Sequence, residues 1–323
     1  MLPPDGEDAE VLNREHVTTR KDPMTDLVIR PITAGEEKLF DSLPDPALVG
    51  RAAFGERYLD MAEAGRYRPE WTWVALRDDV VVARAAWWGG PDDDQPLVFD
   101  WFDFTDPDAA VELLRTAPLR AEYSLSLPPG WRDDPAVRAQ AQARIDAATA
   151  AGMSVLVERY RYRWTTGSAL PDRPGRLTFR PEPDDAVILD VLRRVGEGSL
   201  DAHNRHTTAT SGPDAAAREE LDLLRWLPSP RDWWRLAWTA SGELVGIIVP
   251  ARNHTDPIIG FVGVVPEQRG HGYAYDLLVE GTHLLVEGGA TEIVAATDQT
   301  NHPMAAIFAR AGYPIERERI DLV

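Results

Sequence analysis

The stretch that decides the fold runs from Ile258 to Leu285 and reads IIGFVGVVPEQRGHGYAYDLLVEGTHLL. It opens with an apolar, β-branched run, which is typical of a buried strand. Pro266 has no N–H group to donate to a sheet, so the strand ends there. Gly270 and Gly272 then permit a tight turn, and apolar residues at helical spacing follow. This order predicts a strand, a glycine-rich turn and a helix over 273–287.

The turn before the predicted helix is a candidate anion site. The N–H groups of a helix start point outward, and the helix dipole favours nearby negative charge by about 0.3–1 kcal/mol. Two well-known phosphate loops do not fit. No Lys-Ser or Lys-Thr pair follows the glycines, as a P-loop requires. Tyr275 stands where the dinucleotide-binding fingerprint has its third glycine. A plain connection without a ligand is the alternative.

The segment QRGHGYA, Gln268 to Ala274, resembles the acetyl-CoA signature of the GCN5-related N-acetyltransferase (GNAT) family, whose pattern is [QR]-x-x-G-x-[GA]. Further along, NHPMA from Asn301 and AGY from Ala311 resemble the N-x-x-A/M and G-[FY] ending of that family. The resemblance covers residues 177–323 well and 27–164 faintly. The whole chain looks like a tandem-domain member of an actinobacterial type.

The resemblance implies a fold, a co-substrate and a set of binding residues. The fold would be α/β with a mixed sheet, built as two acyl-CoA N-acyltransferase domains. Acetyl-CoA would be the co-substrate, with its pyrophosphate on the amides of the turn and its pantetheine paired with the end of the preceding strand. The implied cofactor-binding residues are Val264, Val265, Arg269, Gly270, His271, Gly272, Tyr273, Ala274 and Asn301. Asn301 is equally suited to cap a helix, and both roles are compatible.

One position departs from the family pattern. Many members carry a tyrosine seven residues after the asparagine, as the acid that protonates the departing CoA thiolate. This chain has Phe308 there, which cannot donate a proton. A thiol with a pKa near ~8.5 is a fair leaving group without help, so activity does not require that acid. Phe308 is equally well interpreted as a core residue.

The two halves of the chain repeat each other weakly. LVIRPITAGEEKLF from Leu27 parallels LTFRPEPDDAVILD from Leu177, and each reads as a strand followed by a helix. WVALRDDVVVARAAW from Trp73 parallels RLAWTASGELVGIIV from Arg235, and each reads as a hairpin. A third pair ends each half with a glycine and a strand. The matching pieces lie about one domain length apart, which predicts a duplication.

Composition and the repeat predict a disordered tail over 1–25, two domains over 26–165 and 177–323, and a linker over 166–176. The resemblance implies that the first domain is a degenerate GNAT-like domain and the second a C-terminal acetyl-CoA-binding GNAT domain. In the N-terminal half, PLVFDWFDF runs into TDPDAAVELL, with no glycine and with several acidic residues. Acidic side chains would repel a pyrophosphate, so this half is expected to bind no CoA.

Periodicity predicts the elements of the C-terminal half. They are a strand at 177–180, a helix at 184–195, a loop with a helix at 197–227, a hairpin at 233–250, a strand at 258–265, helices at 273–287 and 302–311, a strand at 291–297 between those two helices, and a terminal strand. Strands that alternate with helices after an initial hairpin favour a mixed sheet.

Composition narrows the functional classes. The chain has 323 residues, no cysteine and a formal net charge of −19. Without cysteine there is no disulfide, no cysteine-rich zinc site and no acyl-cysteine intermediate. The negative charge disfavours nucleic acid and anionic membrane as partners. No apolar run approaches the ~20 residues of a membrane span, and no signal pattern opens the chain, so a cytoplasmic location is expected.

A direct transfer needs a base, because an alkyl ammonium has a pKa near ~10.4 and must lose a proton before it attacks. The candidates are Asp201 and His203, in the loop-like segment GSLDAHNRH, and His254, in the turn ARNHTDP that the fold would bring near the acetyl group. Solvated surface turns are the competing interpretation of both segments. Glu197, His206, Asp256 and Asp298 are further candidates. His203 and His206 lack an identified third ligand, so no metal site is expected.

The leading functional hypothesis is therefore an N-acetyltransferase that acts on a small-molecule primary amine in a ternary complex. The acidic chain favours a cationic amine. The alternative is a CoA-binding sensor or pseudoenzyme without turnover, and a structural module without a cofactor is a third hypothesis. The sequence does not indicate an oligomeric state.

Overall fold

The computed structural model describes residues 26–44, 47–90, 92–253 and 255–323, so the predicted tail over 1–25 lies outside the described residues. The N-terminal half contains β1 (Val28–Pro31), α1 (Glu37–Phe40), α2 (Tyr58–Glu63), β2 (Thr72–Arg77), β3 (Val80–Trp88), β4 (Val98–Phe104), α3 (Pro107–Thr116), β5 (Tyr123–Leu127), α4 (Pro135–Ala150) and β6 (Val155–Thr165). The C-terminal half contains β7 (Thr178–Pro181), α5 (Asp185–Gly196), α6 (Ala202–Ser211), α7 (Pro213–Trp226), β8 (Arg235–Trp238), β9 (Leu244–Arg252), β10 (Pro257–Val264), α8 (Tyr273–Glu287), β11 (Glu292–Asp298), α9 (His302–Arg310) and β12 (Ile315–Leu322).

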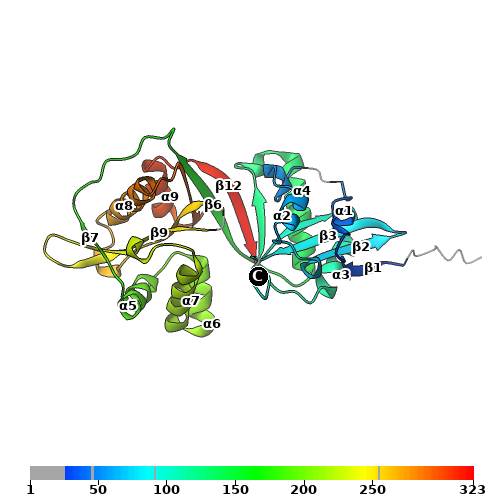
Figure 1. Cartoon of the computed structure of the whole chain (residues 1–323), viewed down its shortest axis with the longest axis horizontal. Coiled ribbons are helices and arrows are strands. Elements are labelled where there is room, and N and C mark those ends of the chain that lie inside the picture. The colour runs from blue at the N-terminus through cyan, green and yellow to red at the C-terminus, as the bar shows by residue number, and fades with distance from the viewer. Residues whose placement is uncertain (1–25, 45–46, 91, 254) are drawn as a thin grey trace, which may run out of the picture.

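All of these strands form one twelve-stranded sheet in the order β1-β2-β3-β4-β5-β12-β6-β11-β10-β9-β8-β7. The five strands β1 to β5 and the five strands β7 to β11 follow the same order from opposite edges. The last strand of each half is exchanged. β12 pairs with β5, and β6 pairs with β11, so each half is completed by a strand from the other half. Figure 1 shows β6 and β12 side by side between the two lobes.

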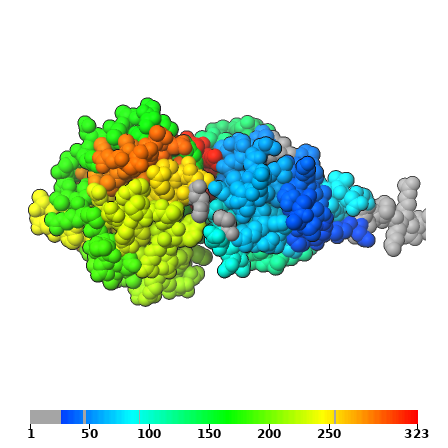
Figure 2. Space-filling view, in the orientation of Figure 1, coloured from blue at the N-terminus to red at the C-terminus, as the bar shows by residue number. Residues whose placement is uncertain are grey.

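The strand exchange is also visible in the packing. Tyr162 and Trp164 of β6 belong to the core of the C-terminal half, under α8. Ile320 and Leu322 of β12 belong to the core of the N-terminal half, under α3 and α4. In the space-filling view, part of β12 lies between the two lobes (Figure 2). The mixed α/β fold built twice, which the repeat predicted, is confirmed, but the two halves share their central strands.

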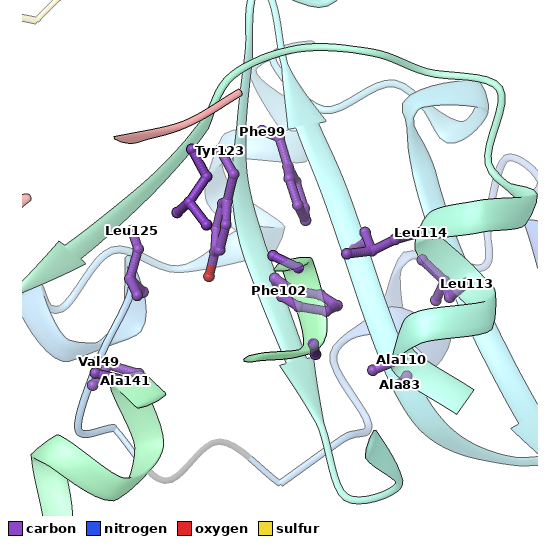
Figure 3. Packing of buried hydrophobic residues seen from close by; sticks show 14 of the residues in the cluster. Val49, Ala83, Phe99, Phe102, Ala110, Leu113, Leu114, Tyr123, Leu125 and Ala141 are labelled. Carbon is purple, nitrogen blue, oxygen red and sulfur yellow. The ribbon is translucent and has the colours of Figure 1, made fainter. Parts of the chain in front are cut away.

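Among the described residues, two pairs of neighbouring strands are parallel, one pair in each half. A gap lies between the two strands of each pair. β10 and β11 are in register only at Ile258 and Val294, and β4 and β5 only at Phe99 and Tyr123. Beyond those positions the neighbouring strands part. In the N-terminal half, aromatic and aliphatic side chains such as Phe99, Phe102 and Tyr123 pack densely there (Figure 3).

The predicted elements of the C-terminal half are present with one correction. The helix predicted over 273–287 is α8, with these bounds. GSLDAHNRH, in contrast, is not loop-like, because most of it belongs to helix α6. Asp201 caps this helix, and its side chain accepts a hydrogen bond from the amide of Asn204. No helix in the described part of the chain is long and apolar enough to cross a membrane.

Candidate functional site

The start of α8 is open. Gly270 and Gly272 have φ angles of 81° and 74°, in the left-handed region that favours glycine. No side chain caps this helix. Within the described residues, no side-chain oxygen accepts a hydrogen bond from the amides of residues 270–274. An uncapped helix start of this kind is a ready anion site, since its N–H groups and its dipole both favour negative charge.

Arg269 contributes less to the turn than its place in the signature suggests. Its amide donates to the carbonyl of Pro266 at 3.2 Å. Its guanidinium donates to the carbonyl oxygens of Val195 and Glu197 at 2.8 and 2.7 Å, and its Nε to that of Val264 at 3.2 Å. Arg269 therefore ties the end of α5 to the end of β10, and the unbonded amides of the turn begin at Gly270.

Positive charge reaches the turn from the predicted linker. Arg176 donates to the carbonyl oxygens of His271 and Gly272 at 3.1 and 3.3 Å. It also forms an ion pair with Asp276, whose side chain is almost fully buried in the first turn of α8. The guanidinium lies 5.0 Å from the ring centre of Tyr273. Arg176 thereby offsets the one buried carboxylate next to the open helix start, a role that its position in a linker did not indicate.

The strands β10 and β11 part and open a cavity of about 450 Å³, which residues 195 and 196, at the end of α5 that Arg269 holds, also line. Residues 259–262 of β10 line one side, and Ala296 and Thr297 of β11 line the other. Helices α5, α6 and α7 cover it. Glu122, directly before β5, and Arg319, in β12, also line it. The cavity is therefore built by both halves of the chain.

Val264 and Val265, which the resemblance implied for pantetheine binding, have different surroundings in the structure. Val265 is fully buried, and its amide donates to Val245 of β9 at 3.0 Å, so it has no free edge toward the cavity. The carbonyl of Val264 accepts from Arg269. The edge of β10 that faces β11 has no strand partner beyond Ile258. A pantetheine arm would therefore meet β10 nearer Phe261 than Val265.

Asn301 and Phe308 lie on α9 at the cavity. The side chain of Asn301 accepts a hydrogen bond from the amide of Met304 at 3.3 Å, so Asn301 caps α9 and lines the cavity at the same time. Phe308 is 1% exposed and stacks on Tyr162 with ring centres 4.5 Å apart. Phe308 is a core residue that also reaches the cavity wall. No residue is assigned as the acid that protonates the CoA thiolate.

Two of the predicted bases lie at the cavity but are engaged. Asp201 accepts from Asn204 as the cap of α6 and lies 3.5 Å from the guanidinium of Arg159. The Nε2 atom of His203 lies 2.6 Å from the carboxylate of Glu122. The hydrogen bond to Glu122 raises the pKa of His203, so the imidazole holds its proton more firmly. Their catalytic roles remain predictions, and His254 lies outside the described residues.

The remaining candidates are placed elsewhere or used in structure. Asp256, in the turn that was expected near the acetyl group, pairs with Arg161 and Arg163 and does not line the cavity. His206 is exposed on α6. Glu197 follows α5, and its side chain is 59% exposed. Asp298 is buried next to the cavity, where its carboxylate accepts from the amide of Ala202 at 2.7 Å and pairs with Arg159.

A carboxyl group that sequence reasoning missed faces the cavity. Glu220 lies on α7 and lines the cavity. Burial, with the nearby charge of Asp201, raises its pKa to about 7. The signal was present in the sequence, because Glu220 shares its helical face with the buried residues Ala217, Leu221 and Leu224. A charged residue on the apolar face of an amphipathic helix is a stronger functional signal than one in a polar segment.

The sequence did not indicate metal partners for His203, because the nearby carboxylates of Glu122 and Asp321 are distant from it along the chain, one on each side. Glu122, His203 and Asp321 place ligand atoms within 4.8 Å of one another. Each is already engaged, however. Asp321 accepts from Ser124 at 3.0 Å and pairs with Arg319, and His203 is bonded to Glu122. A metal ion would have to displace these partners.

Comparisons with known proteins agree with this geometry. The profile described as "Acetyltransferase (GNAT) family" matches residues 202–313. A GCN5-related N-acetyltransferase from Sphaerobacter thermophilus has a similar structure, with 13% identity, coverage of 92% of this chain and 94% of that chain, and a TM-score of 0.52. So has a fungal multi-domain GH3 β-N-acetylglucosaminidase with a GCN5-related glucosamine N-acetyltransferase region, with 14% identity, coverage of 93% and 38%, and a TM-score of 0.52. No curated protein matches the sequence.

The parting strands, the open helix start and much of the cavity lining lie in the segment that matches the acetyltransferase profile, which indicates an acyltransferase. The structural neighbours share the fold at low identity, and the sequence profile covers the segment from α6 to the end of α9 that contains the site. Residues 202–313, about a third of the chain, match the GNAT family of acetyltransferases, and the fold of the chain resembles that of a GCN5-related N-acetyltransferase.

Proposed function

We propose that the protein transfers an acetyl group from acetyl-CoA to a small-molecule primary amine, by direct attack in a ternary complex. One observation carries the proposal. The uncapped start of α8 follows β10, the strand whose residues 259–262 line the cavity between β10 and β11. A diphosphate on the amides of residues 270–274 would direct the thioester arm along β10 into that cavity.

The charges in the cavity favour an amine as the acceptor. Its basic groups are already neutralised, since Arg159 pairs with Asp298 and Asp201, and Arg319 pairs with Asp321. Glu219 and Glu220 add two carboxyl groups to the lining. An ammonium group would compensate this excess of negative charge, in a chain with a net charge of −19. A cationic small amine is therefore the acceptor class that we propose.

The absence of cysteine favours a direct attack. The chain has no cysteine, so an acyl-thioester intermediate on the protein has no site. The protein would bind both substrates, exclude water from the thioester and accept a proton from the amine. Phe308 in the cavity wall supports a thiolate that leaves without a protein acid.

Phe308 also motivates a second candidate function, a CoA-binding sensor without turnover. Both functions predict that acetyl-CoA stabilises the fold, because a ligand that binds only the native state raises the melting temperature. They differ in turnover. The protein is incubated with acetyl-CoA and a panel of chemically diverse amines, and release of free thiol is followed. Turnover above the rate without protein supports the enzyme, and stabilisation without turnover on any amine supports the sensor.

A further inference from the structure

Among the described residues, Glu219 and Glu220 are carboxyl groups of the cavity lining without a partner, and Glu220 is the more buried of the two. Within the described residues, Glu220 has no hydrogen bond and no ion pair to another side chain. It is partly buried on α7, and it lines the cavity. A partly buried carboxylate that faces a cavity and has no donor is less well solvated than one on the surface, so it favours a cationic ligand or a proton.

The groups around Glu220 explain why no cation of the protein satisfies it. Asp201 and His203 face it from α6, Arg159 faces it from β6, and Glu219 precedes it on α7. Arg159 is paired with Asp298 at 3.2 Å and lies 3.5 Å from Asp201. His203 is bonded to the carboxylate of Glu122 at 2.6 Å. The two nearby cations are therefore committed to other carboxylates.

We propose that Glu220 receives the ammonium group of the acceptor and removes its proton. This inference rests on the proposed acetyl transfer and names the proton acceptor that the sequence left open. Glu220 lines the cavity from α7, opposite the β10 residues 259–262 along which the thioester arm is proposed to lie. The cavity between them is large enough for a small amine next to a thioester arm.

The proton and electron balance is complete with the groups present. The ammonium gives one proton to the carboxylate of Glu220 and becomes a neutral amine. The nitrogen lone pair attacks the thioester carbon, so a C–N bond forms and the C–S bond breaks. The sulfur leaves with the electron pair, and the second proton that the nitrogen loses neutralises the thiolate. The products are the acetamide and free CoA, and Glu220 returns its proton to solvent.

The electrostatic setting suits this role. Burial, followed by the charge of Asp201, raises the pKa of Glu220 to about 7, close to neutral pH, where a general base is most effective. The carboxyl is ionised and competent above that pH and protonated below it. The rate is therefore expected to fall as the pH drops through about 7, well above the range in which an ordinary glutamate would titrate.

The test compares three variants of the full chain. Glu220→Gln keeps the shape but cannot accept a proton, and Glu220→Asp keeps a carboxyl group on a shorter side chain. Asp222→Asn removes a negative charge from the exposed side of α7, away from the cavity, and is the matched control. With an amine that the wild-type protein acetylates, kcat/KM is measured from pH 5.5 to 9, and acetyl-CoA affinity is measured by calorimetry. Melting temperatures verify that each variant folds.

We expect Glu220→Gln to lower kcat roughly 10²- to 10⁴-fold, to lose the acidic limb near pH 7, and to bind acetyl-CoA as tightly as the wild type. Glu220→Asp is expected to retain the limb with partial activity, and Asp222→Asn to change little. A Glu220→Gln variant with wild-type turnover and an unchanged pH profile overturns this inference alone. Failure of the wild-type protein to acetylate any amine overturns the proposed function itself.

Discussion

The two halves of the molecule begin their equivalent helices in opposite ways. α3 starts behind Asp106, whose carboxylate accepts from the amide of Ala109 at 3.1 Å and from Arg77 at 2.8 Å. α8 starts behind Gly272, and no side chain caps it. A capped helix start has its donors satisfied and a negative charge in place, whereas an open one retains both for a ligand. The same fold thus offers an anion site in one half and removes it in the other.

The gaps between the parting strands differ in the same sense. In the N-terminal half, Arg144 of α4 is buried in the gap. It donates to the carbonyl of Phe102 at 2.8 Å and to Asp103 at 2.5 Å. Arg84 holds the other side of Asp103. In the C-terminal half, small residues such as Gly260 and Ala296 line the gap and leave it open. A few side chains therefore decide which copy of the fold can accept a thioester arm.

The largest effect is expected on the free energy of unfolding, when the side chain that fills the gap of the N-terminal half is shortened. Arg144→Met removes a buried cation and leaves Asp103 with Arg84 as its remaining partner, so the free energy of unfolding should fall by about 3 kcal/mol. The variant should gain no CoA binding, because Asp106 still caps α3. Denaturant unfolding measures the first effect and calorimetry the second. Arg138→Met, on the exposed side of α4, is the control, and an equal loss of stability there would contradict the explanation.

The next effect comes from closing the open helix start. Gly272→Asp places a carboxylate where Asp106 stands in the other half, and we expect acetyl-CoA affinity to fall roughly 100-fold through repulsion of the pyrophosphate. Gly289→Asp is the matched control, because Gly289 also has a positive φ, follows the far end of α8 and has open space around it. Calorimetry distinguishes the two. Unchanged affinity in Gly272→Asp would remove the turn from the binding site.

A smaller effect is expected from the linker. Arg176→Gln removes a positive charge from the turn and leaves Asp276 uncompensated beneath it, so acetyl-CoA should bind roughly tenfold more weakly. The difference should shrink at high salt, because part of it is screened. Arg173→Gln, in the same linker but paired with Glu280 and Glu287 further along α8, is the control. Equal losses in both variants would indicate a general charge effect.

The smallest effect concerns the contact between the halves. The bond to Glu122 raises the pKa of His203, so the stability that it contributes is present at low pH and is lost as the pH rises through that raised pKa. Glu122→Gln should lower the pKa of His203 toward its ordinary value. An NMR titration of the imidazole measures this, with Glu112→Gln on the exposed side of α3 as the control. An unchanged titration would mean that the pair does not form in solution.

The sequence predicted what local patterns determine. The strand, turn and helix around Gly270 and Gly272, and the repeat of the two halves, were readable because glycine, proline and periodicity act within a few residues. The helix α6 was missed, since Asn, His and Thr have low helix propensity and tertiary packing overrides it. Asp201 could have indicated it, because an aspartate directly before a helical segment is a common cap.

Other features depend on contacts between distant segments. β6 and β12 have similar alternating patterns, and nothing local distinguishes a strand that completes its own half from one that completes the other half. The pairing of His203 with Glu122 follows from that exchange and could not be read from spacing. Glu220 was missed for a different reason. It lies on an apolar helix face, whereas the predicted bases were those of polar segments.

The central claim is that only the C-terminal half binds CoA, through the open start of α8. Calorimetric titration of the full chain with acetyl-CoA tests it most directly. We predict one site per chain, abolished or strongly weakened in Gly272→Asp. Two sites per chain, or no heat at all with the wild-type protein, would contradict the account.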